Sequence, residues 1–235
     1  MSDTTVPTLG YFKARGVSQP IRLLLKYKGV DFIDKHYDSP GADTDEAFKG
    51  NWVKAKFTLG LDFPNVPYYI DGEVKLTKST VIMRYVARKH GLMATDETGL
   101  TRQDVLEQQL MDIRSGYSNL LQSKDYETEK IKYVAKTLPQ QLDSLCRFLG
   151  TRQWFTGNHI NYVDFIVYEQ IDVFRLLSLE TVNKYQNLVQ FLTRFESLPA
   201  IKAYMKSPEF ISWPITGPAF PWGFKKLIYI YPSIS

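Results

Sequence analysis

The spacing of apolar residues changes near residue 95 and divides the chain into two parts. Before this point, short strand-like runs such as TLGYF and DFIDKHYD alternate with helical runs such as QPIRLLLKYKG and TVIMRYVARKHGL. From Thr101 onward only helical periodicity is found. The pattern predicts the order β-α-β-α-β-β-α followed by helices alone, with residues 93–101 as the linker.

The strands of the first part have recognisable connections. The first β-α-β run implies a parallel strand pair, because the helix carries the chain back to the same end of the sheet. Asp71-Gly72, between YYI and EVKL, predicts a tight hairpin turn. Pro67 stands at the entrance to Tyr68–Ile70, although proline is normally kept out of strand interiors. Either a rigid turn or a cis Val66–Pro67 bond that directs the backbone towards a ligand accounts for it, and the residues alone leave both open.

Helical signals in the second part identify its buried faces. Apolar residues recur at helical spacing in Leu106–Ile113 and in Leu138–Leu149, and Gly150 ends the latter run. Asn161 and Asp164 are spaced as a capping box at a helix start. The FIVYEQIDVFRLL segment that follows is apolar nearly all round, so we expect this helix at the centre of the second part.

Composition narrows the class of protein. A chain of 235 residues with 44% hydrophobic and 23% charged residues is typical of a soluble globular protein with a sizeable core. No run approaches the ~20 apolar residues that span a membrane, and the start lacks the features of a secretory signal. Cys146 is the single cysteine, which excludes an internal disulfide or a cysteine metal cluster. We therefore expect a cytoplasmic protein with no bound metal and no membrane partner.

The distribution of charge along the chain indicates which kind of partner the protein binds. The net charge is +4, and the basic residues are scattered along the chain. Proteins that bind nucleic acid usually gather basic residues on one face, so we expect no nucleic-acid partner. A mild positive excess suits a small anionic ligand, or serves solubility alone.

Several motifs, in order, resemble those of a mu-class glutathione transferase: LGYF, RLLL, LGLDFPNVPYYIDG, YVARKHGL, WFTGN and YVDFIVYE. The resemblance covers residues 8 to about 226. It implies an α+β thioredoxin-like glutathione-binding domain at 1–94 and an all-helical domain at 95–235 that carries the electrophile pocket and a C-terminal tail. It also implies a cis bond before Pro67. The first loop, KARGVSQP, has no Cys-x-x-Cys pair, which argues against a thiol–disulfide oxidoreductase.

The implied activity is conjugation of glutathione to hydrophobic electrophiles in detoxification, with glutathione as co-substrate and no other cofactor. A free thiol titrates near ~8.5, so little of it is ionised at neutral pH. A hydroxyl that donates to the sulfur lowers that pKa. Tyr11, in LGYF, matches the family's catalytic tyrosine, although any one of the chain's 15 tyrosines is by itself more often a packing residue. A non-catalytic ligand-binding or structural protein of the same fold is the alternative.

The resemblance implies a glutathione site built from both domains. Its residues are Tyr11, Phe12, Lys49, Trp52, Lys56, Asn65, Val66, Lys78, Ser79 and Asp112, the last reaching across a homodimer interface. Ser79 stands where a strand gives way to a helix, so its hydroxyl, its N–H and the helix dipole can all meet a carboxylate. A plain helix cap explains Ser79 equally well. Trp52 and Lys56 are spaced to share one helix face.

The electrophile pocket departs from the family pattern. Its implied residues are Val17, Met111, Arg114 and Gln122. Gln122 stands where the family has a second tyrosine, which leaves an assisting role there in doubt. The glutathione site departs from the pattern as well: Phe12 replaces a Trp and loses an N–H donor, Lys49 replaces an Arg and keeps the charge but loses the bidentate fork, and Lys78 replaces a Gln and adds a positive charge. The loop DSPGADTDEAFKG is two residues longer than is usual in the family.

Phe63, in LGLDFPNVPYYIDG, bears on whether the protein forms a dimer. It lies two residues before Asn65, between prolines. Packing into its own core is the ordinary role of a phenylalanine. The resemblance instead implies that Phe63 inserts between helices of the partner subunit in a homodimer.

Overall fold

A four-stranded mixed sheet forms the first part of the computed structural model, which describes residues 5–37 and 44–225. The strand order is β2-β1-β3-β4, with β1 (Thr8–Tyr11), β2 (Ile33–His36), β3 (Tyr68–Asp71) and β4 (Val74–Thr77). β1 and β2 are parallel, while β1–β3 and β3–β4 are antiparallel. The predicted parallel pair and element order are confirmed, because a crossover helix joins β1 to β2 and a hairpin joins β3 to β4.

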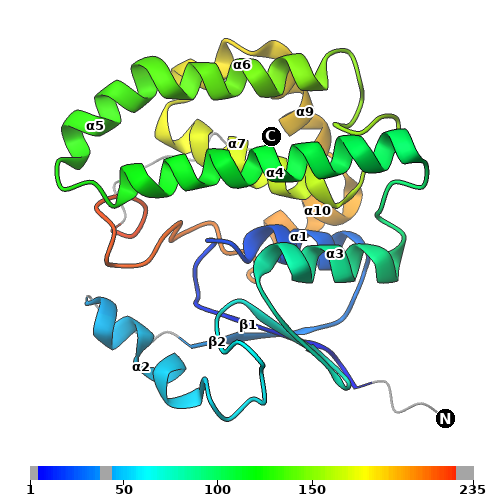
Figure 1. Ribbon diagram of the computed structural model, residues 1–235, viewed down its shortest axis with the longest axis vertical. Coiled ribbons are helices and arrows are strands. Elements are labelled where there is room, and N and C mark those ends of the chain that lie inside the picture. Colours follow the sequence, from blue (N-terminus) through cyan, green and yellow to red (C-terminus); the bar gives the residue numbers. More distant parts are fainter. Residues whose placement is uncertain (1–4, 38–43, 226–235) are drawn as a thin grey trace.

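Three helices accompany the sheet: α1 (Gln19–Tyr27), α2 (Asp45–Ala55) and α3 (Ser79–His90). α1 and α3 lie between the sheet and the helices of the second part, whereas α2 lies at the lower left, away from them (Figure 1). Pro20 stands in the first turn of α1, where its missing N–H costs nothing. Gly91 ends α3 with a φ of 67°, a left-handed conformation that glycine adopts freely.

The turns around β3 differ in one detail from expectation. Asp71 pairs with Val74 in the ladder, so the hairpin turn is Gly72-Glu73 and the prediction of Asp71-Gly72 was one residue too early. Asp71 stays in the strand and accepts hydrogen bonds from Tyr85 (2.9 Å) and Lys89, both on α3. The Val66–Pro67 bond is cis, as the resemblance implied.

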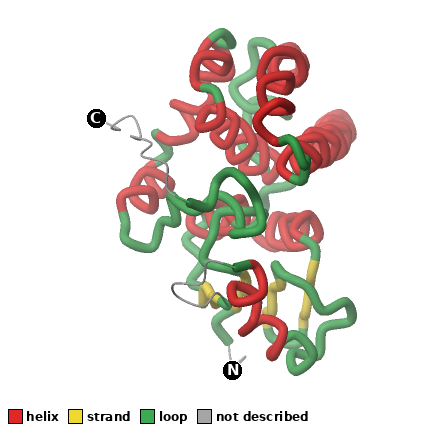
Figure 2. The backbone as a smooth tube through the Cα atoms, turned by 90° about the vertical axis from the view of Figure 1, so that its left-hand side faces the viewer, coloured by secondary structure: helices red, strands yellow, loops and turns green. Residues whose placement is uncertain are grey.

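The regular elements of the second part are all helices, as predicted, and the chain from 207 to 225 runs on without a helix (Figure 2). Its helices are α4 (Glu97–Leu121), α5 (Tyr126–Lys132), a π-helical turn η1 (Tyr133–Thr137), α6 (Leu138–Leu149), α7 (Tyr162–Leu177), α8 (Leu179–Asn183), α9 (Gln186–Glu196) and α10 (Pro199–Lys206). α4 begins inside the segment predicted as linker, because Asp96 caps it by accepting from the N–H of Gly99 at 2.9 Å. None of the helices within 5–37 and 44–225 has the length and apolar character to cross a membrane.

α7 is the centre of the core. It packs against α1, α4 and α9, and thirteen of its sixteen residues are buried. The predicted capping box is present: Asp164 accepts from the N–H of Asn161 at 2.9 Å, and the Asn161 side chain accepts from the first turn. The leucine faces of α4 and α6 are also buried. Helix α7 thus supplies a rigid wall behind the loop that follows β1. The thioredoxin-like α+β sheet followed by an all-helical part confirms the predicted fold class.

Candidate functional site

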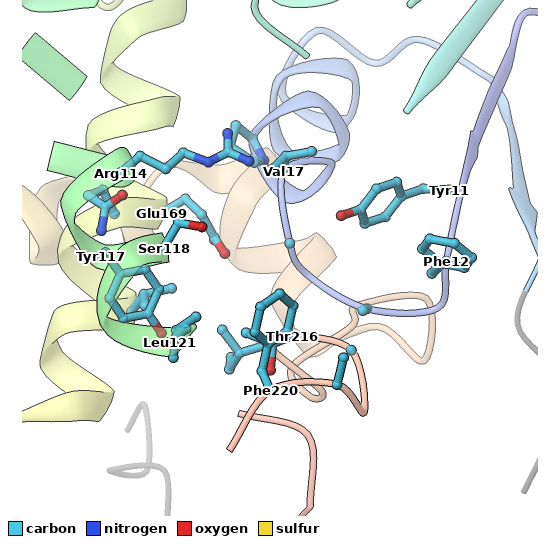
Figure 3. Close-up of a pocket in the computed structure, with 18 of the residues that line it drawn as sticks. Tyr11, Phe12, Val17, Arg114, Tyr117, Ser118, Leu121, Glu169, Thr216 and Phe220 are labelled. Atoms are coloured by element: carbon cyan, nitrogen blue, oxygen red, sulfur yellow. The ribbon is translucent and has the colours of Figure 1, made fainter. Parts of the chain in front are cut away.

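Two neighbouring cavities lie between the first part of the chain and α4. The first has a volume of about 320 Å³ and is enclosed by the loop after β1, by α4 and α7, and by the segment 215–220 (Figure 3). Its lining is largely apolar and includes Phe12, Val17, Phe48, Leu121, Ile166, Val173, Ile215 and Phe220. Such a wall suits a small hydrophobic molecule.

The second cavity is more open and more polar. It measures about 580 Å³ and is lined from the first part by Asn65, Val66, Pro67, Lys78, Ser79 and Thr80, and from α4 by Met111, Arg114, Ser115, Ser118, Asn119 and Gln122. Val17, Arg114 and Ser118 line both cavities. A ligand in one cavity would therefore lie beside a ligand in the other.

Tyr11 ends β1 and lines the first cavity, with its hydroxyl turned towards Val17 and α4 (Figure 3). Burial raises the pKa of Tyr11 above its ordinary value, and a backbone hydrogen bond from Val17, with the charges of Arg114 and Arg22, opposes only part of that rise. The hydroxyl consequently stays protonated at neutral pH. Since the Val17 N–H donates to its oxygen, the phenolic proton remains available for a ligand atom.

Gly16 allows the loop to reach this hydroxyl. Its φ is +45°, and a Cβ added there would lie 2.4 Å from the Tyr11 oxygen. The N–H of Gly16 donates to the carbonyl of Ile215 at 3.0 Å, and the N–H of Arg15 donates to that of Pro214 at 2.8 Å. These two hydrogen bonds to residues 214–215 therefore hold the loop after β1 in place beside Tyr11.

A buried ion cluster anchors the same loop to α7. Arg15 is 1% exposed and donates to both carboxylate oxygens of Glu169, at 3.0 and 2.8 Å, and to Asp172 at 2.6 Å. Burial alone would raise the pKa of Asp172, but the charges of Arg15 and Arg175 hold it below its usual range. Burial raises the pKa of Glu169 and Arg15 opposes the rise. The loop is fixed on two sides, so Tyr11 meets a preorganised partner at Val17.

The structure brings most of the predicted site residues to the two cavities. Tyr11, Phe12 and Lys49 line the first cavity; Asn65, Val66, Lys78, Ser79, Met111 and Gln122 line the second; Val17 and Arg114 line both. Phe12 packs on Phe48, with ring centroids 4.9 Å apart. The Gln122 side chain folds back on α4 and donates to the Ser118 hydroxyl at 2.9 Å.

Three predicted residues line neither cavity. Trp52 is buried against Tyr37 and Tyr68, with ring centroids 5.3 and 6.1 Å away. Lys56 follows α2 and places its ammonium over the ring of Phe57, 4.6 Å from the centroid. Asp112 is exposed on α4. Their proposed contacts with a ligand stay predictions.

Ser79 is not the helix cap. Lys78 occupies that position, with a φ of 70°, and Ser79 is the first residue of α3. The Lys78 side chain makes no capping hydrogen bond, and Lys78, Ser79 and Thr80 line the second cavity, so the positive end of the helix dipole of α3 lies at that cavity. This arrangement favours an anion. Within the described residues, no group of three or more His, Cys, Asp or Glu side chains could hold a metal ion.

Comparison with known proteins agrees with this geometry. The family model "Glutathione S-transferase, N-terminal domain" matches residues 7–88, and "Glutathione S-transferase, C-terminal domain" matches residues 111–208. Glutathione S-transferase Mu 1 of Oryctolagus cuniculus is 46% identical over 88% of this chain and 94% of its own. Glutathione S-transferase 2 of Gallus gallus is 44% identical over 94% of this chain and 99% of its own. The chain belongs to the mu class of the glutathione S-transferase family.

Solved structures of glutathione S-transferases share the fold of this chain. The crystal structure of the glutathione S-transferase Blo t 8 matches with a TM-score of 0.84 and 31% identity, over 92% of this chain and 99% of that one. The Pi-class glutathione S-transferase of Onchocerca volvulus matches with a TM-score of 0.81 and 27% identity, over 92% of this chain and 100% of that one.

Reasoning from sequence missed several residues of this glutathione transferase site. They are Arg15, Gly16, Phe48, Tyr117, Ser118, Glu169 and the segment 214–220. A glycine directly before Val17 in KARGVSQP was a usable signal, since glycine marks close approach of the backbone. The proline- and glycine-rich run PITGPAFPWG was another, because it cannot continue a helix. The pairing of Arg15 with α7 had no local signal at all.

Proposed function

We propose that this chain binds reduced glutathione in the second cavity, ionises its thiol beside Tyr11 and transfers it to a hydrophobic electrophile in the first. One observation carries the proposal. The protonated, buried hydroxyl of Tyr11 lies beside Val17 and Arg114, the residues that line both cavities. A sulfur placed there accepts a hydrogen bond from Tyr11 and faces the apolar wall of the first cavity.

The second cavity suits an extended, anionic peptide. The backbone of Val66, ahead of the cis bond to Pro67, offers an edge to which a cysteinyl residue adds like a strand. The Val66 N–H now donates to the Asn65 side chain at 2.9 Å, so the ligand takes over that bond. The start of α3 at Ser79 receives the γ-glutamyl carboxylate, with Lys78 beside it. The glycyl carboxylate extends towards Lys49, Trp52 and Lys56.

The chemistry follows from the charge state of the sulfur. The hydroxyl of Tyr11 donates to the thiolate and stabilises it, so a larger fraction of bound glutathione is ionised at neutral pH. The thiolate attacks an electrophilic carbon held against Phe48, Ile166 and Val173; with an aryl halide the carbon–sulfur bond forms and the halide leaves with the electrons of the carbon–halogen bond. The thiol proton leaves to solvent through the open second cavity. Gln122 is not required for these steps.

Two further aspects belong to the same proposal. The chain forms a two-fold homodimer in which Phe63, 74% exposed in a single subunit, enters the partner, and Asp112 contacts the ammonium of the partner's glutathione. It acts in the cytoplasm in the detoxification of electrophiles; the free Cys146 fits a reducing compartment.

The ultraviolet absorbance of the thiolate, titrated against pH with glutathione bound, tests the proposal together with turnover of an aryl halide. We expect the thiol pKa to lie clearly below ~8.5, with measurable conjugate formation. Tight binding with an unshifted thiol pKa and no turnover would instead identify a binding protein.

A further inference from the structure

Tyr37 and Tyr68 form a buried pair of hydroxyl groups beside α2. Their oxygens are 2.7 Å apart, so one hydroxyl donates a hydrogen bond to the other. Tyr37 is 6% exposed and Tyr68 is 2% exposed, and neither belongs to the described lining of the two cavities. Burial and the bond to Tyr37 raise the pKa of Tyr68 above its ordinary value, so its hydroxyl stays protonated. The transfer proposed above makes no use of this pair.

The pair belongs to a small aromatic core that is separate from the main one. Its buried members are Tyr37, Trp52, Leu61 and Tyr68. Tyr37 directly follows β2, Tyr68 begins β3 and Trp52 belongs to α2, so the small core joins three segments of the first part. Val66, on the wall of the second cavity, packs against it. The small core therefore lies directly behind the proposed glutathione site.

Trp52 is the residue of α2 that this small core holds. Its indole stacks on the ring of Tyr68 and meets the ring of Tyr37 edge-on, with centroids 6.1 and 5.3 Å away. The bond between the two hydroxyls fixes how the tyrosine rings are turned, and thereby the surface on which the indole rests. Since α2 lies away from the helices of the second part, its position depends on side-chain contacts of this kind (Figure 1).

The face of α2 that Trp52 anchors also carries two lysines. Lys49 stands three residues before Trp52 and Lys56 stands four residues after it, so the three side chains follow one stripe of the helix surface. An ammonium on either side of a fixed indole suits a carboxylate, and the glycyl carboxylate of glutathione is the group proposed to reach this stripe. A rotation of α2 about its axis would move both ammonium groups away from that carboxylate.

We propose that Tyr37 and Tyr68 are positioning residues, whose paired hydroxyls hold α2 in the orientation that binds the glycyl carboxylate of glutathione. The inference rests on the proposed function and adds to it two residues that do not touch the ligand. Removal of one hydroxyl leaves the other buried without a partner, which costs more than the bond contributes. The rings then turn, and Trp52 follows them. The cysteinyl end is affected little, because the pairing of Gly10 with Tyr68 in the sheet involves the backbone alone.

The test compares glutathione with its glycinamide analogue, in which a neutral amide replaces only the glycyl carboxylate. Calorimetric titration of wild type should show tighter binding of glutathione. We expect Tyr37→Phe to raise the Kd of glutathione ~5-fold and to change that of the amide little, because the amide has no charge to lose contact with the lysines. Tyr37→Leu, which also removes the ring beside Trp52, should cause a larger selective loss. At saturating glutathione, kcat of Tyr37→Phe should equal that of wild type, since Tyr11 is untouched.

Tyr133→Phe is the matched control. It deletes a buried hydroxyl that is bonded to Gln141, also at 2.7 Å, in the second part of the chain. Neither Kd should change in this variant. Thermal unfolding shows which variants are folded, and Tyr37→Phe, which keeps the ring, decides the matter if Tyr37→Leu does not fold.

Three results would overturn the inference. An unchanged glutathione affinity in Tyr37→Phe does so whatever Tyr37→Leu shows, and so does an equal loss with glutathione and the amide, which assigns the pair to the general stability of the first part. Wild type that binds both ligands equally well also overturns it; a lowered thiol pKa in the same samples would leave the proposed function intact. Wild type that does not bind glutathione at all removes both the inference and the proposed function.

Discussion

The hydroxyl oxygen of Tyr11 lies so close to Gly16 that a Cβ atom at position 16 would be 2.4 Å from it. No real Cβ contact is that short, and the oxygen belongs to a ring that Phe12 holds on one side at a centroid distance of 5.5 Å. Gly16 also has a φ of +45°, which side-chain-bearing residues rarely adopt. Only glycine at this position lets the loop present the Val17 N–H to Tyr11.

Gly16→Ala should therefore displace Tyr11 or the loop and reduce activity. We expect kcat/KM with an aryl halide to fall by about an order of magnitude or more, with the thiol pKa of bound glutathione moving up, since a displaced donor weakens. Gly29→Ala is the control for backbone strain alone, because Gly29 has a φ of +64° and no atom within 4 Å of an added Cβ. Equal activity losses in both variants would show that strain, not the contact with Tyr11, is responsible.

Tyr11→Phe removes the proposed donor without changing the ring. We expect the fold and most glutathione affinity to persist while kcat/KM falls ~10²-fold. The matched control is Tyr133→Phe, which deletes a hydroxyl bonded to Gln141 at 2.7 Å outside both cavities. Unchanged activity with an unchanged thiol pKa in the Tyr11 variant would rule out Tyr11 as the activator.

The pH profile gives a second measurement on Tyr11. Because burial raises its pKa above the ordinary value of 10.0, the donor form persists up to about pH 10. In wild type, kcat/KM should rise as the thiol ionises and then stay level through pH 9. In Tyr11→Phe the rise should move to near ~8.5, the pKa of a free thiol. A decline of the wild-type rate between pH 7 and 9 contradicts a protonated Tyr11 with a raised pKa.

The parts of the fold that could be predicted are those with a local cause. The buried faces of α4 and α6 follow from leucine spacing, and the start of α7 follows from Asn161 and Asp164, three residues apart. The start of α4 was placed too late, because the cap at Asp96 lies in a polar run whose members compete as caps. The hairpin turn lies one residue later than predicted, because strand pairing rather than turn chemistry sets the register of Asp71.

The residues of the candidate site also fall into those that could be predicted from the sequence and those that could not. Tyr11, Asn65 and Ser79 sit in motifs whose order carries information, and the structure places them on the walls of adjoining cavities. The ion pairs that hold the loop after β1 against α7 could not be predicted, because Arg15 and Asp172 are 157 positions apart and each looks like an ordinary surface charge. The same holds for the bond from Gly16 to Ile215, which forms only when the chain is folded.

Lys49 and Lys78 stand on the walls of the first and second cavities. If both face carboxylates of glutathione, its affinity should weaken as salt is raised, because partly exposed charge pairs are screened. Replacing each with Met should flatten the dependence of log Kd on log salt, measured by calorimetric titration. Lys184→Met, which removes an exposed partner of Glu180 on α8, should leave the slope as it is. A slope that survives both cavity substitutions makes Lys49 and Lys78 ordinary surface charges.

Phe63 is 74% exposed, so packing into its own core does not explain it. Burying a phenylalanine contributes about 1.5–3 kcal/mol, and a two-fold dimer makes the contact twice. Removing it therefore costs about 3 kcal/mol or more of association free energy, roughly 10²-fold in the dimer dissociation constant. Ile131, at 70% exposure on α5 and outside both cavities, offers a comparison in which apolar surface is removed from another site.

We expect Phe63→Ser to shift the protein towards monomer and to weaken glutathione binding in parallel, since each site borrows Asp112 from the partner subunit. Ile131→Ser should remain dimeric and bind normally. Sedimentation velocity and calorimetric titration on the same samples make the measurement, over a range of protein concentrations that spans the dimer dissociation constant. A Phe63 variant that stays dimeric would remove this side chain from the interface. One that is monomeric yet binds glutathione at full strength would break the proposed link through Asp112, because the contact with the ligand would then not depend on assembly.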